Sequence, residues 1–434
     1  MKSKILTTAL LISLPFLLTA CTLQDLPVIG KFFGGGAPQV QGPTTLSMWG
    51  LWESPQVMNA LIAKYKETHP NVTINYDDRS VLKLEDYKQT VYTRATQADA
   101  PDIVVIHNSW VPGLKDALSP APSNVITPQI YSQRFYSIAV KSAVLNNNVY
   151  ALPLFYDGLV LVYNKDHFAE IDQKSPPTAW EEFRRIAVAL TVRSGKGDGS
   201  IVRGGAAIGT ADNIDFFSDI LGLMFVQAKV DIPNDLDTKP AQDAVTFYTN
   251  FAKEDKVWSN DMPEASVAFV SGRASMIFVP AWNLLDIVAA RPDMNIGVAP
   301  VPQAIPNDPV SWGSFWMTSV TAGSKNKAAA WDFIKFLSDN DQQLQLFSEA
   351  SKNKPYGPAF SSMDLKAQLD TNQYLKPLLD QATFAASGIM AARSGNKTSI
   401  DAMRGAVDSL LDGSKQTTVQ DAVTTAKAAI ARTK

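Results

Sequence analysis

The chain has 434 residues, of which 46% are hydrophobic and 19% are charged, and its formal net charge is −3. This length allows two or three globular domains. The near balance of charges argues against a nucleic-acid-binding function, because that function needs a basic excess or a basic stripe.

The N-terminal segment is typical of a secreted protein. Lys2 and Lys4 precede an apolar run at residues 5–18, which is the pattern of a signal peptide. Threonine, serine and proline interrupt the run, so a permanent membrane span is the weaker interpretation. The run ends in the sequence LTAC, which resembles the lipobox of bacterial lipoproteins, where the cysteine is acylated. We expect a signal peptide at residues 1–20 and a lipid on Cys21; the alternative is an ordinary signal peptide with an incidental cysteine.

Residues 21–43 are expected to form the lipidated cysteine and a flexible linker, because glycine and proline dominate and no hydrophobic period is present. Cys21 is the only cysteine, so no disulfide is expected within the chain. Two acyl chains anchor a protein stably. The predicted location is the cell envelope, on the extracytoplasmic face of a membrane, in a periplasm or at the cell surface.

The folded part is predicted to begin with an α/β pattern. Short strands are expected at residues 46–49, 72–76 and 103–106, with helices at residues 53–69 and 85–97 between them. This alternation favours a parallel sheet covered by helices. Ligands of such sheets bind at the carboxyl ends of the strands. The residues expected there are Trp49, Trp52, Glu53, His107, Asn108 and Trp110, of which His107 is interpreted as structural.

Residues 149–165 form an apolar stretch that is interrupted at Tyr156-Asp157-Gly158. About 15 residues at about 3.3 Å each span roughly 50 Å, which is too long for one ordinary strand. The stretch alone fits a hairpin as well as a crossing from one sheet to another. The α/β patterns on both sides favour the crossing, because a crossing joins them into two lobes.

Later parts of the chain add helices and strands. A capping box is predicted at the start of the helix at residues 179–190, with Thr178 as N-cap and Glu181 as its partner. Residues 327–346 have the period of one amphipathic helix. Further helices are expected at residues 216–225, 240–251 and 419–431, and further strands at residues 275–279, 295–301 and 317–320.

Several segments together resemble the extracellular solute-binding proteins of ABC sugar importers, the family of the maltose-binding protein. They are residues 150–165, the sequence PPTAWEEF at 176–183, residues 269–282 and residues 313–337. The resemblances follow the family's order and extend over nearly all of the chain from Thr44. They imply an α/β, two-lobe type II periplasmic-binding-protein fold with an interlobe cleft and hinge crossings.

The resemblance also implies the division of the chain and its function. One lobe would comprise residues 44–155 and 313–352, and the other residues 156–312 and 353–434. The implied protein is not an enzyme. It is a lipid-anchored, monomeric substrate-binding component of an ABC transporter, which captures a mono- or oligosaccharide by lobe closure and delivers it to the membrane permease. No nucleic acid, cofactor or metal is expected, and the three histidines are scattered.

A carbohydrate site needs hydrogen-bonding side chains for hydroxyl groups and flat aromatic rings for the C–H faces of the sugar. Trp282 aligns with a stacking position of the family, and Asp157 with a ligand-contact position. The full set of predicted ligand-binding residues is Trp49, Trp52, Glu53, Asn108, Trp110, Tyr156, Asp157, Trp282, Asn283, Trp312, Trp316, Tyr356 and Arg393.

Two alternatives use the same residue types. A lipid-anchored glycoside hydrolase needs two carboxyl groups about 5–10 Å apart, and Glu53 and Asp157 are the possible pair. A carbohydrate receptor without a transport role would share the fold. Product release from a glycan distinguishes the hydrolase, and association with a permease distinguishes the transport component.

Overall fold

The computed structural model describes residues 42–195 and 199–432. The predicted signal peptide, Cys21 and most of the predicted linker lie outside these residues. Within the described ranges, no helix is long and apolar enough to cross a membrane.

The first sheet is built mainly from the N-terminal part of the chain. Its strand order is β2-β1-β3-β14-β4, and β7 also pairs with β14. The parallel arrangement predicted for the first three strands is confirmed, since β1 pairs with β2 and β3 in parallel. The strands are β1 (Thr44–Gly50), β2 (Val72–Asp78), β3 (Ile103–His107), β4 (Leu118–Ser119), β7 (Leu152–Pro153) and β14 (Trp316–Thr321). The connecting helices include α2 (Pro55–Thr68) and α3 (Leu84–Arg94), close to the predicted ranges.

The second sheet has β8 (Leu159–Asn164) at its centre, between β11 (Met276–Pro280) and β12 (Ile296–Ala299). Both neighbours run antiparallel to β8. Every residue of β8 is buried, which agrees with its continuous run of apolar residues.

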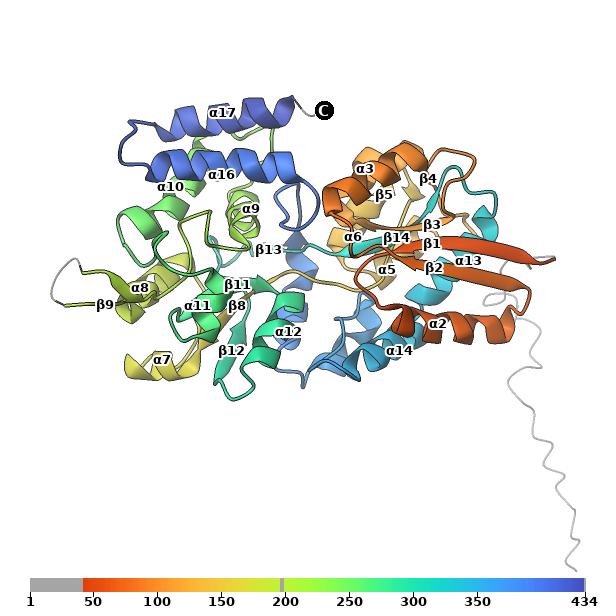
Figure 1. Cartoon of the computed structure of the whole chain (residues 1–434), viewed down its shortest axis with the longest axis horizontal. Coiled ribbons are helices and arrows are strands. Elements are labelled where there is room, and N and C mark those ends of the chain that lie inside the picture. The colour runs from red at the N-terminus through yellow and green to blue at the C-terminus, as the bar shows by residue number, and fades with distance from the viewer. Residues whose placement is uncertain (1–41, 196–198, 433–434) are drawn as a thin grey trace, which may run out of the picture. The chain divides into compact units, whose positions relative to one another are not determined.

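The stretch at residues 149–165 crosses from the first sheet to the second. Pro153 pairs with Met317 in the first sheet, and Leu159 pairs with Pro280 in the second. The crossing prediction is therefore confirmed and the hairpin interpretation is wrong. A second crossing, from β13 (Ser311–Trp312) to β14, runs beside it, and Gly158 and Gly313 form a bridge between the two crossings. Figure 1 shows these connections between the two groups of elements.

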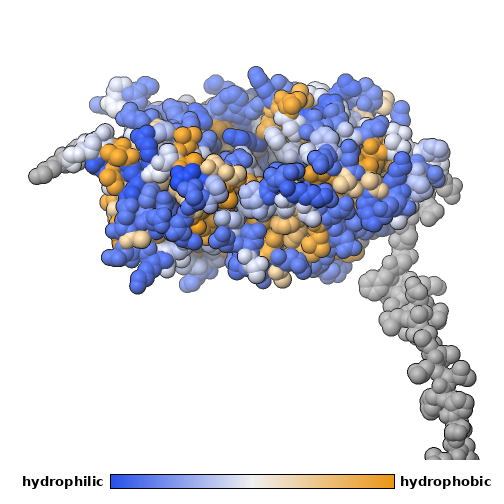
Figure 2. Space-filling view, turned by 60° about the horizontal axis from the view of Figure 1, so that its bottom comes forward, coloured by the Kyte–Doolittle hydropathy of each residue, from blue (hydrophilic) through white to orange (hydrophobic). Residues whose placement is uncertain are grey.

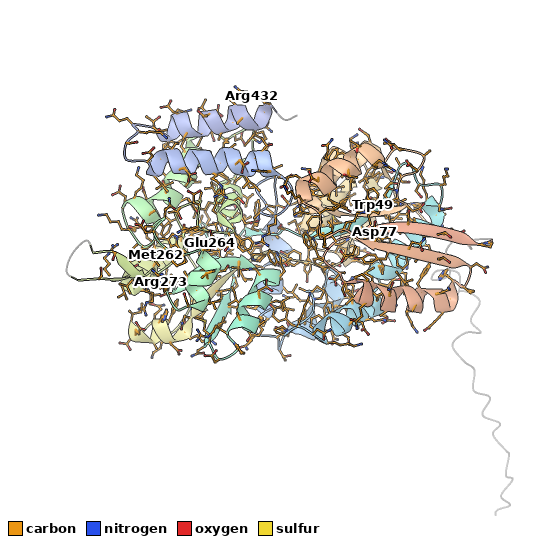
Figure 3. The ribbon with its side chains drawn as sticks, in the orientation of Figure 1. Trp49, Asp77, Met262, Glu264, Arg273 and Arg432 are labelled. Atoms are coloured by element: carbon orange, nitrogen blue, oxygen red, sulfur yellow. The ribbon has the colours of Figure 1, made fainter. Side chains whose placement is uncertain are left out.

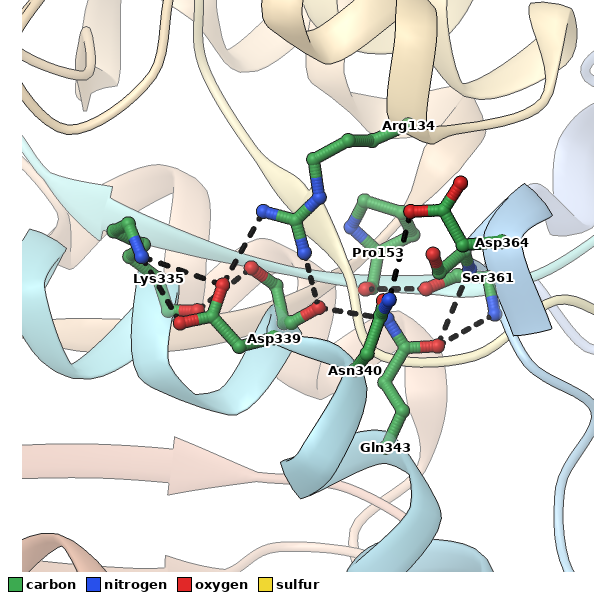
Figure 4. Close-up of polar contacts among 10 residues, drawn as sticks. Arg134, Pro153, Lys335, Asp339, Asn340, Gln343, Ser361 and Asp364 are labelled. Atoms are coloured by element: carbon green, nitrogen blue, oxygen red, sulfur yellow. Dashed lines mark hydrogen bonds and ion pairs between the residues drawn. The ribbon is translucent and has the colours of Figure 1, made fainter. Parts of the chain in front are cut away.

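The helix predicted at residues 327–346 is divided at Asp339 into α13 (Lys327–Ser338) and α14 (Asn340–Ser351). Asp339 has an extended backbone, with ψ of 151°. Figure 4 shows the cause: the carbonyl of Ser338 accepts hydrogen bonds from Arg134 at 2.9 Å and from Gln343 at 2.7 Å. Side chains thus satisfy a carbonyl that a continuous helix would have paired with a backbone N–H group.

Gln343 also fixes the chain beyond α14. Its side-chain oxygen accepts from the backbone N–H groups of Ser361 and Ser362, at 2.9 and 3.2 Å. The Ser361 hydroxyl donates to the carbonyl of Pro153 at 3.0 Å (Figure 4). The segment that follows α14 is therefore attached to the first crossing.

The predicted capping box is wrong. Helix α8 (Trp180–Leu190) begins one residue later than expected, and its N-cap is Ala179, which has no side-chain cap. The N–H group of Thr178 donates to Glu182, not to Glu181. The buried Trp180 explains the start, because its indole donates to Gln227 at 2.7 Å and holds this residue in the core.

The other elements cover the two sheets, and α16 and α17 form a helical pair beside α10 (Figure 1). Hydrophobic residues on the visible face are in patches among hydrophilic ones (Figure 2). The remaining helices are α4 (Val111–Leu114), α5 (Pro128–Arg134), α6 (Ser137–Ala143), α7 (Lys165–Glu170), α9 (Phe217–Gln227), α10 (Lys239–Lys253), α11 (Ala265–Val270), α12 (Ala281–Ala290), α15 (Lys376–Asp380), α16 (Lys397–Leu411) and α17 (Val419–Ala431). Short strand pairs are β5 (Val144–Leu145) with β6 (Asn148–Val149), β9 (Val192–Arg193) with β10 (Ile201–Arg203), and β13 with β15 (Ala385–Ala386).

Candidate functional site

A cavity of about 420 Å³ lies where the elements of the two sheets meet. We call it the aromatic cavity, because Trp52, Phe155, Trp282 and Trp316 contribute rings to its wall. Its polar and apolar lining also includes Asp157, Leu285, Asp286, Ser314, Asn353, Lys354, Ala392 and Arg393. A smaller hollow of about 90 Å³ shares several of these residues and adds Glu53, Tyr156 and Tyr356. The structure thus brings eight of the predicted residues to one site: Trp52, Glu53, Tyr156, Asp157, Trp282, Trp316, Tyr356 and Arg393.

Two tryptophan rings of the cavity are accessible to a ligand. Trp52 follows β1 of the first sheet and is 42% exposed, and Trp282 begins α12 beside the second sheet and is 37% exposed. Trp316 supports Trp52, with ring centroids 5.8 Å apart at 60°. Phe216 supports Trp282 in an edge contact at 5.7 Å. Large, rigid and partly exposed rings of this kind suit contact with apolar ligand faces.

The backbone is unusual at two of the lining residues. Trp52 has φ of 69° and Arg393 has φ of 50°, a conformation that is uncommon for residues other than glycine. The N–H group of Trp52 donates to the Ser80 hydroxyl at 2.6 Å, and that hydroxyl donates to Asp78 at 2.5 Å. Such backbone outliers persist where the surrounding contacts hold them, and they gather at functional sites.

Asp157 positions Trp282. Its carboxylate accepts from the N–H group of Gly158 at 2.6 Å, and from those of Ala281 at 2.8 Å and Trp282 at 3.2 Å. The last two groups are at the N-terminus of α12, where a negative charge is favourable. Burial raises the pKa of Asp157 to about 7, and the three backbone N–H groups act against this rise. A carboxylate on the first crossing therefore holds the start of the helix that carries Trp282.

Glu53 lies in the wall of the smaller hollow and is only 6% exposed. Burial raises the pKa of its carboxyl to about 7, while the Lys354 ammonium lowers the pKa and the Asp78 carboxylate raises it further. Its carboxyl group is therefore partly protonated near neutral pH.

The two tyrosines form walls of the smaller hollow. The hydroxyl of Tyr356 donates to the carbonyl of Ala281 at 2.9 Å, so it also supports the start of α12. The ring of Tyr156 is buried and packs on Tyr136 at 5.1 Å and Phe315 at 5.7 Å. Arg393 is exposed, and its guanidinium lies 4.9 Å from the centre of the Trp282 ring, which is a cation–π distance.

Three of the predicted tryptophans do not line the aromatic cavity. Trp49 lies on the face of β1 opposite the buried Met48, and the Arg79 guanidinium covers its ring at 3.7 Å. Figure 3 labels Trp49 beside Asp77, its partner on the neighbouring strand. Trp110 and Trp312 are each 1% exposed. Their indole N–H groups donate within the protein, to the Ser394 carbonyl and the Asp219 carboxylate, each at 2.6 Å.

The two predicted asparagines are also outside the aromatic cavity. Asn108 is buried, and its side-chain oxygen accepts from the N–H group of Phe315 at 3.2 Å. Asn283 accepts from the Ser266 hydroxyl at 3.2 Å. His107 has a structural environment, with its ring nitrogens 2.8 Å from the Ser109 hydroxyl and 3.0 Å from the Ser314 hydroxyl. Burial lowers the pKa of His107 to about 3, so the ring is neutral.

Several lining residues were not predicted. Phe155 is two residues before Asp157, so the period of two in an extended segment could have placed both on one face. Leu285 and Asp286 follow Trp282 by three and four positions, which is the spacing of one helical face. Lys354 lies in an irregular segment after α14, and no sequence pattern indicated its position.

The family model of the bacterial extracellular solute-binding proteins matches residues 50–344, and the chain belongs to this family. It is 22% identical over 302 residues to the maltotriose-binding protein of Pyrococcus abyssi, which covers 67% of this chain and 61% of the relative.

Solved structures show the same fold. The sugar-binding protein MalE of Xanthomonas citri matches with a TM-score of 0.72 at 17% identity, over 90% of this chain and 98% of that chain. The cyclic α-maltosyl-1,6-maltose binding protein of Arthrobacter globiformis matches with a TM-score of 0.69 at 19% identity, over 90% and 98%. The predicted two-lobe fold of the sugar-binding proteins is confirmed.

Proposed function

We propose that this protein is the substrate-binding component of an ABC transporter and that its ligand is a carbohydrate. The single observation that carries the proposal is the pair of accessible rings, Trp52 and Trp282, which face one cavity from elements of the two sheets. The carbohydrate ligands named for the similar proteins of Pyrococcus abyssi and Xanthomonas citri support the ligand class.

In this proposal the two tryptophan rings contact the C–H faces of the sugar. Arg393, Lys354, Asp286 and Ser314 supply donors and acceptors for its hydroxyl groups. A ligand that contacts both lobes stabilises the closed arrangement of the protein. Micromolar affinity corresponds to about −8 kcal/mol and is sufficient for capture. The closed form would then deliver the sugar to the membrane permease.

We propose the lobe division at residues 44–155 with 313–352 and residues 156–312 with 353–434. Two crossings of the chain that run antiparallel, with a bridge between Gly158 and Gly313, support it. The monomeric state is part of the proposal.

The proteins of this family are extracellular solute-binding proteins, so this protein acts outside the cytoplasm. We propose that a lipid on Cys21 anchors it to a membrane surface, on the basis of the LTAC sequence. Replacing Cys21→Ser should move the protein from the membrane fraction to the soluble fraction in a fractionated host. Retention in the membrane fraction would contradict the anchor.

The test of the ligand class is a thermal-shift and calorimetric screen against neutral mono- and oligosaccharides. At least one should raise the melting temperature and bind with a micromolar or lower Kd, and chromatography should recover it unchanged. Trp282→Ala should weaken binding at least tenfold, whereas Trp49→Ala, which removes a ring outside the cavity, should not. Absence of binding to every carbohydrate would refute the ligand class, and release of cleaved products would favour a glycoside hydrolase.

A further inference from the structure

A second, larger hollow of about 1060 Å³ lies near the aromatic cavity. It is lined by polar residues of α3 and of the segment before α16, among others. Its lining includes Asn108 and Ser109 from one lobe and Gly395 and Asn396 from the other. Ala392 and Arg393, which precede these last two residues closely in the chain, line the aromatic cavity.

The contact between Trp110 and Ser394 lies between the two hollows. Trp110 follows Ser109 of the larger hollow, and its ring lies 5.4 Å from that of Trp316 in the aromatic cavity. Ser394 lies between Arg393 of the aromatic cavity and Gly395 of the larger hollow. The indole N–H group of Trp110 donates to the Ser394 carbonyl at 2.6 Å, and Trp110 is 1% exposed. Trp110 and Ser394 therefore lie between lining residues of the two hollows, and we call their contact the wall.

The segment at residues 391–396, which we call the strap, is held on the second lobe. The N–H group of Ala392 donates to Asp219 at 3.0 Å, and the Ser394 hydroxyl donates to the Ala391 carbonyl at 2.5 Å. Asp219 belongs to α9, which also receives the Trp312 indole. These hydrogen bonds attach the strap to the second lobe.

The strap also contacts the first lobe tightly. The Lys88 ammonium donates to the Asn396 side-chain oxygen at 2.6 Å, and the Asn396 amide donates to the Ser109 hydroxyl at 3.0 Å. Gly395 has φ of 67°, and a Cβ there would lie 3.4 Å from the Trp110 ring. Figure 1 shows the chain that enters α16 beside α3, in agreement with these bonds.

We propose that the contact between Trp110 and Ser394 limits the length of the ligand, so that the protein takes a mono- or disaccharide rather than a longer chain. This inference rests on the proposed function. A cavity of about 420 Å³ is at the small end of the usual ligand-site range of about 300–1,000 Å³. A longer chain must pass the wall to enter the larger hollow. It would separate the buried indole from its only acceptor among the described residues, and such a loss is unfavourable.

The test is calorimetric titration of the full-length chain with α-1,4- and β-1,4-linked glucose oligomers, from glucose to the heptasaccharide. The wild-type protein should bind glucose or a disaccharide at least tenfold more tightly than the tetrasaccharide and longer oligomers. Trp110→Ala opens the wall, so the ratio of tetrasaccharide to disaccharide affinity should increase at least tenfold, while the lost hydrogen bond between the lobes lowers the affinity for all lengths by a common factor. Trp110→Phe, which keeps a ring but removes the donor, should give a smaller gain and serves if the alanine variant does not fold.

Asn396→Ala is the matched control. It removes the bonds to Lys88 and Ser109 but leaves the wall, so it should weaken binding of all lengths by the same factor. Equal or tighter wild-type binding of long oligomers, or an unchanged length profile in both Trp110 variants, would overturn the length limit alone. If the carbohydrate screen and all these oligomers give no binding, the proposed function fails, and the length limit fails with it.

Discussion

Glu53 makes the stability of the protein depend on pH. Its folded-state pKa is about 7, against an ordinary value of 4.5. Between these values the unfolded chain has lost the proton that the folded chain still holds, so the free energy of unfolding decreases as the pH rises. Below pH 4.5 the group is protonated in both states and its contribution is fully present; above pH 7 the contribution is lost.

We therefore predict that Glu53→Gln reduces the loss of stability between pH 5 and pH 7. At 1.36 kcal/mol per pKa unit, the carboxyl accounts for a loss of about 2 kcal/mol in that window. Urea unfolding of the ligand-free protein at both pH values measures it. Asp286→Asn, which removes an exposed carboxylate of the same cavity, is the control and should leave the loss as in the wild type. An equal loss in the wild type and the Gln variant would show that Glu53 does not carry the effect.

Trp312 contributes to stability through its indole. The indole donates to the buried Asp219 carboxylate at 2.6 Å, and Asp219 accepts one further bond, from Ala392. Trp312→Phe would leave a buried carboxylate oxygen unpaired, which costs about 1–3 kcal/mol. Denaturant unfolding should show this loss.

Trp331→Phe is the matched control for Trp312→Phe. Trp331 is equally buried, but its indole nitrogen has no hydrogen-bond partner in the described part of the chain. The two substitutions remove similar volumes, so their difference in unfolding free energy isolates the hydrogen bond. Equal losses would mean that the bond to Asp219 contributes nothing net.

The tryptophans show how far the sequence predicts the site. Six of them were expected at strand ends, and three of these, Trp52, Trp282 and Trp316, line the aromatic cavity. The directions in which the other three indole side chains point depend on hydrogen-bond or packing partners that are distant in the chain. Trp110 contacts a strap residue 284 positions away, and Trp312 contacts Asp219, 93 positions away. Local periodicity carries no information on such partners.

At the scale of elements, the two crossings depend on a close backbone approach at Gly158. A Cβ at Gly158 would lie 2.3 Å from the backbone oxygen of Trp312, which is closer than such atoms approach in proteins. The obstacle is backbone on the neighbouring crossing, so relief requires moving one strand relative to the other. Gly158→Ala should therefore lower the melting temperature by several degrees, which differential scanning calorimetry measures.

The control for this substitution is Gly405→Ala. Gly405 lies within α16, and outside its own turn of the helix no atom of the described residues lies within 4 Å of the position of a Cβ. Alanine stabilises a helix interior by about 1 kcal/mol relative to glycine, so this variant should melt at the same or a higher temperature. A Gly158→Ala protein as stable as the wild type would show that the crossings can separate freely.

Helices and strands with strong local patterns could be predicted from the sequence, but the break between α13 and α14 could not. The parallel strands and the closing helix follow from hydrophobic period and length, and the α/β patterns on both sides of residues 149–165 favoured the crossing. The end of α13 does not, because Asp339 continues the helical period of residues 327–346. It is Arg134, about 200 positions earlier, that binds the Ser338 carbonyl and fixes the break.

At the scale of the whole molecule, we expect the strap to affect the balance between open and closed lobes in the proposed mechanism. Three hydrogen bonds join it to the first lobe: from Trp110 to Ser394, from Lys88 to Asn396, and from Asn396 to Ser109. A net contribution of about 1 kcal/mol for each is comparable with the few kcal/mol that separate such conformations. We therefore expect these bonds to favour the closed arrangement before any ligand binds.

Asn396→Ala removes two of the three bonds, together about 2 kcal/mol, so the ratio of closed to open molecules should fall by roughly thirtyfold, and the apparent ligand affinity should fall with the closed population. Small-angle X-ray scattering should show a larger radius of gyration for the ligand-free variant than for the wild type, and saturating ligand should bring both to the same smaller value.

Lys397→Ala is the control, because the ammonium of the neighbouring Lys397 pairs with Asp401 within α16 and makes no bond to the described residues of the first lobe. If the ligand-free radius is the same in all three proteins while affinity falls only in Asn396→Ala, the side chain acts on the ligand and not on closure. A ligand-free radius that already equals the saturated value in the wild type, and rises only in Asn396→Ala, would mean that the strap alone is sufficient to close the lobes.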